Sequence, residues 1–159
     1  MNSLPDPSLD ILYIDNHLIA VRKPAGMLTQ QDDSGESSLM DHVKDWIKTE
    51  YKKPGKVFLG LVHRLDRPVS GVVVFARTSK GASRLSEQFR QKTTKKIYRA
   101  LVEGTPDPRK NHLTHYLRKE KTFKATVFPR PTPNASEAVL DYEVIKTLSN
   151  TSLLDIHLH

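Results

Sequence analysis

Four consecutive apolar residues, Val72 to Phe75, follow a proline and a glycine and constrain the fold more than any other segment. A run of β-branched and aromatic residues of this length is typical of a strand that is covered on both faces. We therefore predict that Val72–Phe75 is a central strand. Pro68 lacks an N–H and Gly71 tolerates unusual φ angles, so the residues before the strand should form an irregular loop.

This predicted loop places one carboxylate between two arginines, because Asp66 has Arg64 and Arg67 close on either side. Flanking positive charge favours the ionised form of a carboxylate, and an ionised carboxylate can act as a nucleophile. Loops that lead into a strand are common positions for reactive residues. A solvated cluster of surface charges is the competing interpretation, and charge pattern alone does not separate the two.

Periodicity and capping residues predict the other elements. We expect a β-hairpin turning at Asp15-Asn16, a mobile loop over residues 28–37, and a helix that begins at Ser37 or Ser38. A second helix should begin at Thr78 or Ser79. Further expectations are a strand that places Tyr98, Ala100 and Val102 on one face, a hairpin over residues 112–128 with a basic tip at 118–121, and a half-buried strand that ends the chain.

Composition limits the classes of protein that are possible. The 159 residues include no cysteine, which excludes a disulfide framework and a zinc site built on thiolates. The histidines show no metal-ligand spacing with carboxylates, so we predict no metal site. There is no long apolar run and no basic region followed by an apolar stretch at the N-terminus. We therefore expect a soluble cytoplasmic protein that is not associated with a membrane.

Positive charge is concentrated in the middle of the sequence. The net charge is +7, and residues 51–130 alone hold 20 Lys/Arg against 5 Asp/Glu. A segregated positive charge attracts polyanions, with an affinity that falls steeply as salt rises. Nucleic acid is therefore a candidate partner, and a solvated lysine-rich face is the alternative.

Four segments together resemble one family. His63-Arg64-Leu65-Asp66-Arg67, followed by Ser70-Gly71, is similar to the His-Arg-Leu-Asp signature of the RluA-type pseudouridine synthases, which isomerise uridine in RNA. The segments 16–27, 96–104 and 138–144 agree with that family in order and spacing, although Asp141 replaces its usual threonine. Four motifs in family order make coincidence an unattractive explanation.

The resemblance implies an α+β fold, in which a largely antiparallel mixed sheet is packed by a few helices. It also implies that residues 1–159 form a single catalytic domain without the small S4-type RNA-binding domain of some relatives. Family members continue beyond this point into a Thr-Gly-Arg segment whose arginine pairs with the catalytic aspartate. We therefore expect the catalytic domain to be incomplete at the C-terminus, and the activity of this form is an open question.

By the same resemblance, Asp66 is the catalytic nucleophile and Tyr98 is the active-site tyrosine, in a reaction that uses neither a metal nor an organic cofactor. Arg64 would fill the gap that the extruded base leaves in the RNA. Arg64 could instead only balance Asp66, and a strand tyrosine is often simple packing. We expect His63 to be a hydrogen-bonded structural residue.

The predicted RNA contacts are basic residues in and around the motifs. Their members are Arg64, Arg67, Lys23, Lys95 and Lys96. For Lys23, a structural role and a phosphate contact remain equally open. The predicted function is isomerisation of uridines in ribosomal or transfer RNA, with no obligatory protein partner. The alternative is a truncated, non-catalytic RNA-binding protein.

Overall fold

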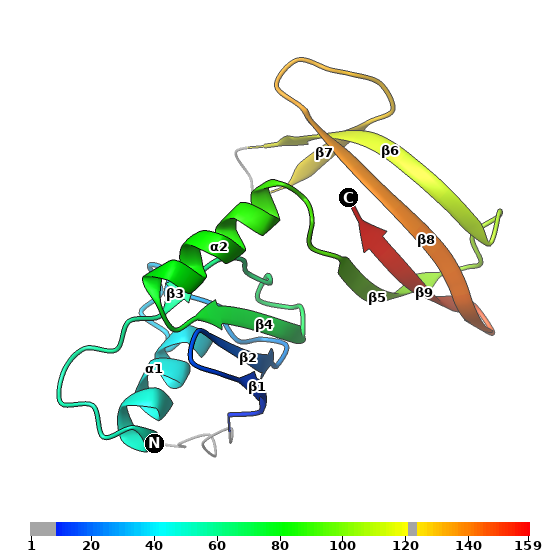
Figure 1. Cartoon of the computed structure of the whole chain (residues 1–159). Coiled ribbons are helices and arrows are strands. Elements are labelled where there is room, and N and C mark those ends of the chain that lie inside the picture. The colour runs from blue at the N-terminus through cyan, green and yellow to red at the C-terminus, as the bar shows by residue number, and fades with distance from the viewer. Residues whose placement is uncertain (1–8, 121–123) are drawn as a thin grey trace. The chain divides into compact units, whose positions relative to one another are not determined.

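The computed structural model describes residues 9–120 and 124–159, which form two compact units divided between Thr93 and Thr94 (Figure 1). Both units combine antiparallel strands, and the first adds two helices. The predicted α+β class is thereby confirmed, with the strands divided between two sheets. Neither described helix, at 12 residues each, is long and apolar enough to cross a membrane.

The sheet of the first unit has four strands in the order β1-β2-β4-β3, and its bounds are β1 Ile11–Ile14, β2 Leu18–Lys23, β3 Gly60–Leu61 and β4 Gly71–Ala76. The predicted turn joins β1 to β2, and the Asp15 carboxylate accepts the N–H groups of His17 and Leu18 at 2.7 and 2.6 Å. An aspartate that binds backbone N–H groups ahead of it stabilises such a turn.

The predicted central strand is β4, which is paired on both sides, with β2 and with β3. Val73 and Phe75 are completely buried, but 53% of Val72 is exposed. The prediction of burial on both faces is therefore wrong, because the face of Val72 and Val74 is only partly covered. Hydrophobicity in consecutive residues identified the strand correctly, yet it could not show that the cover is incomplete where the strand emerges from the loop.

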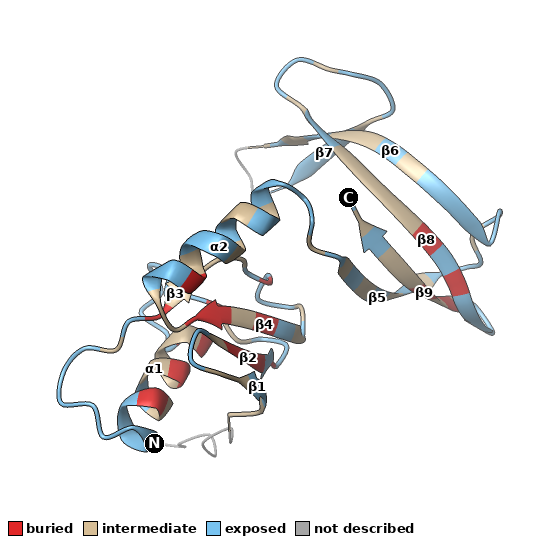
Figure 2. Cartoon of the chain, in the orientation of Figure 1, coloured by how far each residue is buried: buried red, intermediate tan, exposed pale blue. Residues whose placement is uncertain are grey.

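Two helices pack on this sheet and begin where the capping residues predicted. In α1 (Leu39–Glu50), Ser38 and Asp41 form a reciprocal capping box, and Thr78 caps α2 (Ser79–Arg90) by accepting the N–H of Gly81. Figure 2 shows the buried residues of this unit gathered on β2, β4 and one side of α1. The completely or almost completely buried apolar side chains of this unit are Ile19, Val21, Leu39, Val43, Ile47, Val73, Phe75 and Ala76.

The sheet of the second unit has the strand order β5-β9-β8-β6-β7, and all of its pairs are antiparallel. The bounds are β5 Lys96–Glu103, β6 Lys110–Lys119, β7 Ala125–Phe128, β8 Ser136–Leu148 and β9 Thr151–Leu158. The predicted hairpin is the β6–β7 pair. Lys121, at its predicted basic tip, lies outside the described residues.

One face of the second sheet carries its core. Tyr142, Val144 and Leu154 are buried there, with other apolar side chains of β5, β6, β8 and β9 packed around them. Along β5 the side chains alternate between half-buried and exposed, so Tyr98 shares the core face with Ala100 and Val102 as predicted. The opposite face remains open, because Ile97 and Leu101 are 57% and 64% exposed.

In the first unit, the contact between β3 and α2 provides a test of how the helix packs on the sheet. An ideal Cβ on Gly60 would lie 2.8 Å from the Cβ of Ala82 in α2. We expect Gly60→Ala to lower the free energy of unfolding by about 1–3 kcal/mol, because an added methyl group must displace the helix. Urea denaturation measures the change.

Gly55→Ala is the matched control, because a Cβ at Gly55 would meet no atom within 4 Å. Its effect should stay within about 0.5 kcal/mol, as for most surface substitutions. Equal stability of the two variants would contradict the close approach of β3 and α2.

Candidate active site

The signature loop runs between β3 and β4, and Leu65 anchors it. Leu65 is 9% exposed, and its backbone N–H and C=O both bond to the hydroxyl of Thr29, at 3.2 and 2.7 Å. On either side of this anchor, Arg64 and Asp66 are exposed. The Asp66 carbonyl accepts the N–H of Val69 at 3.0 Å, which closes a turn directly after the carboxylate. The loop therefore buries its leucine and presents the two charged candidates to solvent.

His63 is a structural residue, as predicted. Its Nε2 accepts the backbone N–H of Val74 at 2.9 Å, and its ring stacks on Phe89 of α2 with centroids 5.0 Å apart. Burial lowers the pKa of His63, because a charged imidazolium loses its hydration there. The neutral ring, protonated at Nδ1, is the form that this hydrogen bond requires.

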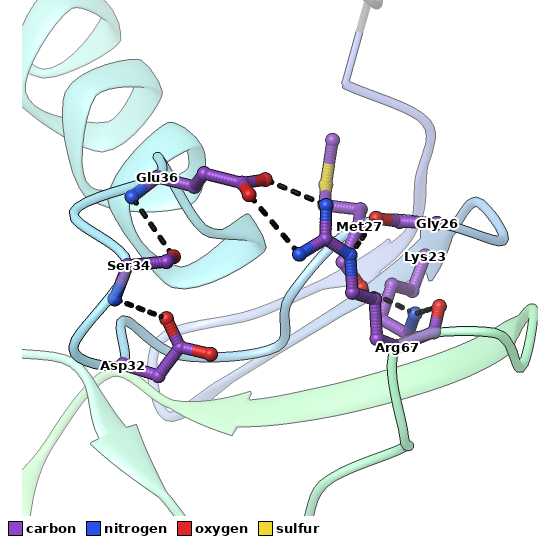
Figure 3. Close-up of polar contacts among 7 residues, drawn as sticks. All are labelled: Lys23, Gly26, Met27, Asp32, Ser34, Glu36 and Arg67. Carbon is purple, nitrogen blue, oxygen red and sulfur yellow. Dashed lines mark hydrogen bonds and ion pairs between the residues drawn. The ribbon is translucent and has the colours of Figure 1, made fainter.

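Arg67 ties three segments together (Figure 3). Its guanidinium makes a two-pronged ion pair with Glu36, at 3.1 and 2.7 Å, and its Nε donates to the Gly26 carbonyl at 3.0 Å. Its own carbonyl accepts the Gly26 N–H at 2.8 Å. The expectation that Arg67 is a counterion of Asp66 is therefore wrong in this structure, because its guanidinium is directed to Glu36.

The loop over residues 28–37 was expected to be mobile, and the structure instead gives it several attachments. Asp32 accepts the N–H of Ser34, whose hydroxyl accepts the N–H of Glu36, and Glu36 reaches Arg67 (Figure 3). Thr29 holds the start of the loop against Leu65. Sequence analysis missed Thr29 and Glu36, because neither lies in an apolar pattern or a signature and their partners are more than thirty residues away.

Lys23 is completely buried at the end of β2. Its ammonium donates to the carbonyls of Pro24, Met27 and Arg67 at 3.2, 2.7 and 3.1 Å, which uses all three of its N–H groups. The predicted phosphate contact is therefore corrected in favour of the structural alternative, since a buried and fully bonded ammonium does not present a charge to RNA.

Lys23 is also the cation that interacts with Asp66. Burial lowers the pKa of Lys23, and the negative charge of Asp66 opposes that shift. Among the described residues, no side chain forms a hydrogen bond or an ion pair with the Asp66 carboxylate, and the same holds for the Arg64 guanidinium. Asp66 is thus an exposed carboxylate near a buried positive charge, and Arg64 is exposed without a competing anion.

The other candidates belong to the second unit. Tyr98 is half-buried on β5, opposite Ile156 of β9. Lys95 is exposed immediately before the strand, and Lys96 is half-buried as its first residue. The neighbouring Arg99 is occupied by an ion pair with Asp155 at 2.8 Å. In the described part of the chain, neither Lys95 nor Lys96 has an ion pair, so both ammonium groups can accept an anionic partner.

A cavity of about 400 Å³ lies beside the turn that follows β2. Arg22, Lys23, Met27, His42 and Ser70 contribute to its lining. Asp66 does not line it, so we do not assign the reacting base to this cavity.

Comparison with known proteins identifies the family of this chain. A family model described as RNA pseudouridylate synthase matches residues 17–159. The chain belongs to this family. The match includes the signature loop, the turn after β2 and the tyrosine-bearing strand, and it confirms the resemblance on which the sequence prediction was built.

Individual relatives support the same assignment. The chain is 36% identical over 138 residues to a tRNA pseudouridine synthase C from Haemophilus influenzae, covering 87% of this chain and 55% of that protein. It is 39% identical over 101 residues to a dual-specificity RNA pseudouridine synthase RluA from the same organism, covering 62% of this chain and 42% of the relative. The chain thus spans about half the length of the curated relatives it matches.

A solved structure shows the same fold. Human RNA pseudouridylate synthase domain containing 4 aligns with a TM-score of 0.77 over 94% of this chain and 58% of the human chain, at 24% sequence identity. The fold class that the resemblance implied is therefore found in a structurally determined protein.

The contacts of Lys23 predict a stability effect. We expect Lys23→Met to lower the free energy of unfolding by about 2–4 kcal/mol, because three carbonyls lose their donor in a buried position. Urea denaturation measures the change. Lys80→Met, which removes an exposed ammonium from α2, is the control and should change stability by less than about 0.5 kcal/mol. A Lys23→Met protein as stable as this control, but weaker in RNA binding, would restore the phosphate-contact interpretation.

The buried ring of His63 predicts a pH dependence. Below a pH of about 6.5, this histidine is protonated in the unfolded state. In the folded state it stays neutral to a lower pH, because burial lowers its pKa there. The unfolded state then binds more protons, so stability should fall as pH falls from about 7 towards 5. His63→Gln keeps an acceptor for Val74 but does not titrate, and it should lose less stability over that interval. Identical pH profiles of the two proteins, measured by urea denaturation, would contradict this account.

Proposed function

We propose that this chain provides catalytic machinery for the isomerisation of uridine to pseudouridine in structured RNA. The observation that carries the proposal is the signature loop, in which an anchored backbone presents an unpaired Asp66 carboxylate to solvent. Family membership supports the reaction class. In this proposal, residues 1–159 belong to one catalytic domain.

The reaction must begin with removal of the target base from its stack. Extrusion into a site costs a few kcal/mol and leaves a gap in the RNA. We assign Arg64 to that gap, because its guanidinium is exposed and has no competing anion among the described residues. A planar guanidinium can stack between bases and can also contact phosphate.

Asp66 then assists cleavage of the glycosidic bond as a nucleophile. The bond between ribose C1′ and uracil N1 breaks, the uracil turns, and a bond from C1′ to uracil C5 forms. The bond that the Asp66 carboxylate made, to the ribose or to the base, breaks again and leaves the carboxylate free. The proton displaced from C5 is lost and N1 regains one, so the product is an isomer and no electrons are exchanged. Attack by the carboxylate on either ribose or base would satisfy this balance, and neither route requires an organic cofactor.

Tyr98 is proposed as the platform for the uracil and as a participant in the later proton transfer. An aromatic ring can stack on a base, and a phenolic hydroxyl can relay a proton. Its position on the regularly paired strand β5 would hold the ring in a defined orientation. Rigid elements position reactive groups more accurately than loops do.

The contacts around Lys23 and Arg67 support Asp66 indirectly. Lys23 fixes the Arg67 carbonyl next in sequence to Asp66, and Arg67 fixes Glu36 and Gly26. Holding a nucleophile in place avoids an entropic cost during reaction. In this proposal Lys23 acts on the loop from inside the protein, whereas Arg67, which is half exposed at its side chain, can still approach RNA.

The proposed substrate is ribosomal or transfer RNA, in the cytoplasm. The concentration of Lys and Arg in residues 51–130 supports a polyanionic partner. Lys95 and Lys96, which precede and begin β5, are the proposed phosphate contacts on the second unit. Similarity to a tRNA pseudouridine synthase and to a dual-specificity RNA pseudouridine synthase supports RNA as the substrate.

Asp66→Asn is the decisive variant. It keeps the side-chain volume and removes the nucleophilic charge, so pseudouridine formation should fall to background while RNA affinity changes less than about threefold. Nucleoside chromatography of digested RNA measures product, and filter binding measures affinity. Asp33→Asn, in the exposed loop over residues 28–37, is the control and should retain the wild-type rate.

Product formation by the Asp66→Asn protein would refute the nucleophilic role. A wild-type chain that binds RNA but forms no pseudouridine would instead favour the alternative of a non-catalytic RNA-binding protein. The two measurements therefore separate the identity of the nucleophile from the function of the chain.

A further inference from the structure

The open face of the second sheet carries a cluster of two histidines and an aspartate. Asp141 lies between them, with one carboxylate oxygen 2.7 Å from Nδ1 of His112 and the other 2.7 Å from Nε2 of His159. One ligand atom from each of the three residues lies within 4.8 Å of the other two. The sequence prediction of no metal site did not anticipate this arrangement.

Strand register creates the cluster. His112 of β6 is the direct cross-strand partner of Asp141 of β8, and Asp141 is in turn the partner of His157 of β9. Because side chains alternate along a strand, His159 lies on the same face as His157. The backbone N–H of His159 donates to the Val139 carbonyl at 3.1 Å, which holds this residue against β8.

We propose that His112, Asp141 and His159 form a binding site for a zinc-like divalent transition-metal ion. Imidazole nitrogen and carboxylate oxygen are the ligands that zinc takes in proteins, at about 2.0–2.2 Å. Tetrahedral coordination at that length requires ligand atoms about 3.3 Å apart. Small side-chain rotations would achieve this from separations of 2.7 to 4.8 Å.

Two features of the surroundings of the cluster suit a metal ion. Thr114 Oγ1 lies 3.5 Å from the second ring nitrogen of His112, where a partner can fix the tautomer that leaves Nδ1 free for a metal. The site is accessible, since about half of each side chain is exposed. The one remaining position of a tetrahedral ion could therefore be filled by water.

The metal would link three strands, β6, β8 and β9, at one point. The metal has no part in the isomerisation proposed above, because that reaction exchanges no electrons and is assigned to side chains of the protein alone. The inference is therefore independent of that function. Magnesium is a poor candidate because it prefers oxygen ligands, whereas two of the three donors here are imidazoles.

Isothermal titration calorimetry with zinc chloride tests the site, using the 159-residue chain. We expect one zinc ion per chain, no heat of binding with magnesium chloride, and an affinity at least tenfold weaker in His112→Asn, Asp141→Asn and His159→Gln. His42→Asn, which removes a histidine of α1, is the matched control and should bind as the wild type does. Zinc should also raise the melting temperature of the wild type and of this control, and of none of the ligand variants.

Cobalt absorption on the wild-type chain provides a second measurement that does not depend on the folding of any variant. Tetrahedral coordination by nitrogen and oxygen donors gives intense visible bands, and zinc should abolish them by displacement. Zinc affinity unchanged in both histidine variants would overturn the proposal. A wild-type chain without a stoichiometric site, or without these cobalt bands, would also overturn it.

Discussion

The ammonium of Lys23 is the interaction on which the candidate active site depends. It is buried and satisfied by three carbonyls, two from the turn after β2 and one from Arg67 in the signature loop. A charge is stable in such a place only when every donor is bonded. Lys23 therefore ties the turn to the signature loop from inside the protein, and two hydrogen bonds between Gly26 and Arg67 connect the same two segments.

A second set of contacts divides the signature loop into an inner and an outer side. Thr29 bonds both backbone groups of Leu65, which draws this residue inward. The residues on either side are then left exposed, and these are Arg64 and Asp66. The presentation of a reactive carboxylate thus follows from the burial of its apolar neighbour, and the charge near Asp66 comes from the protein interior through Lys23.

Local patterns predicted the elements of this fold well. Serine and threonine caps located the start of both helices, and consecutive apolar residues located β4, because these signals act over a few residues. The same information could not identify the partner of Arg67. Flanking charges in sequence suggested Asp66, but the loop geometry turns the guanidinium to Glu36, thirty-one residues away.

Non-local pairing explains what else escaped prediction. The alternation of Leu154, Ile156 and Leu158 indicated a half-buried strand, yet nothing in it showed that β9 lies between β5 and β8 with neighbours on both sides. Strand order also decides which polar side chains become neighbours. His112, Asp141 and His159 have unremarkable spacing in sequence, and only the register of three strands places their donor atoms together. A site made by register can be found from sequence only after the order of the strands is known.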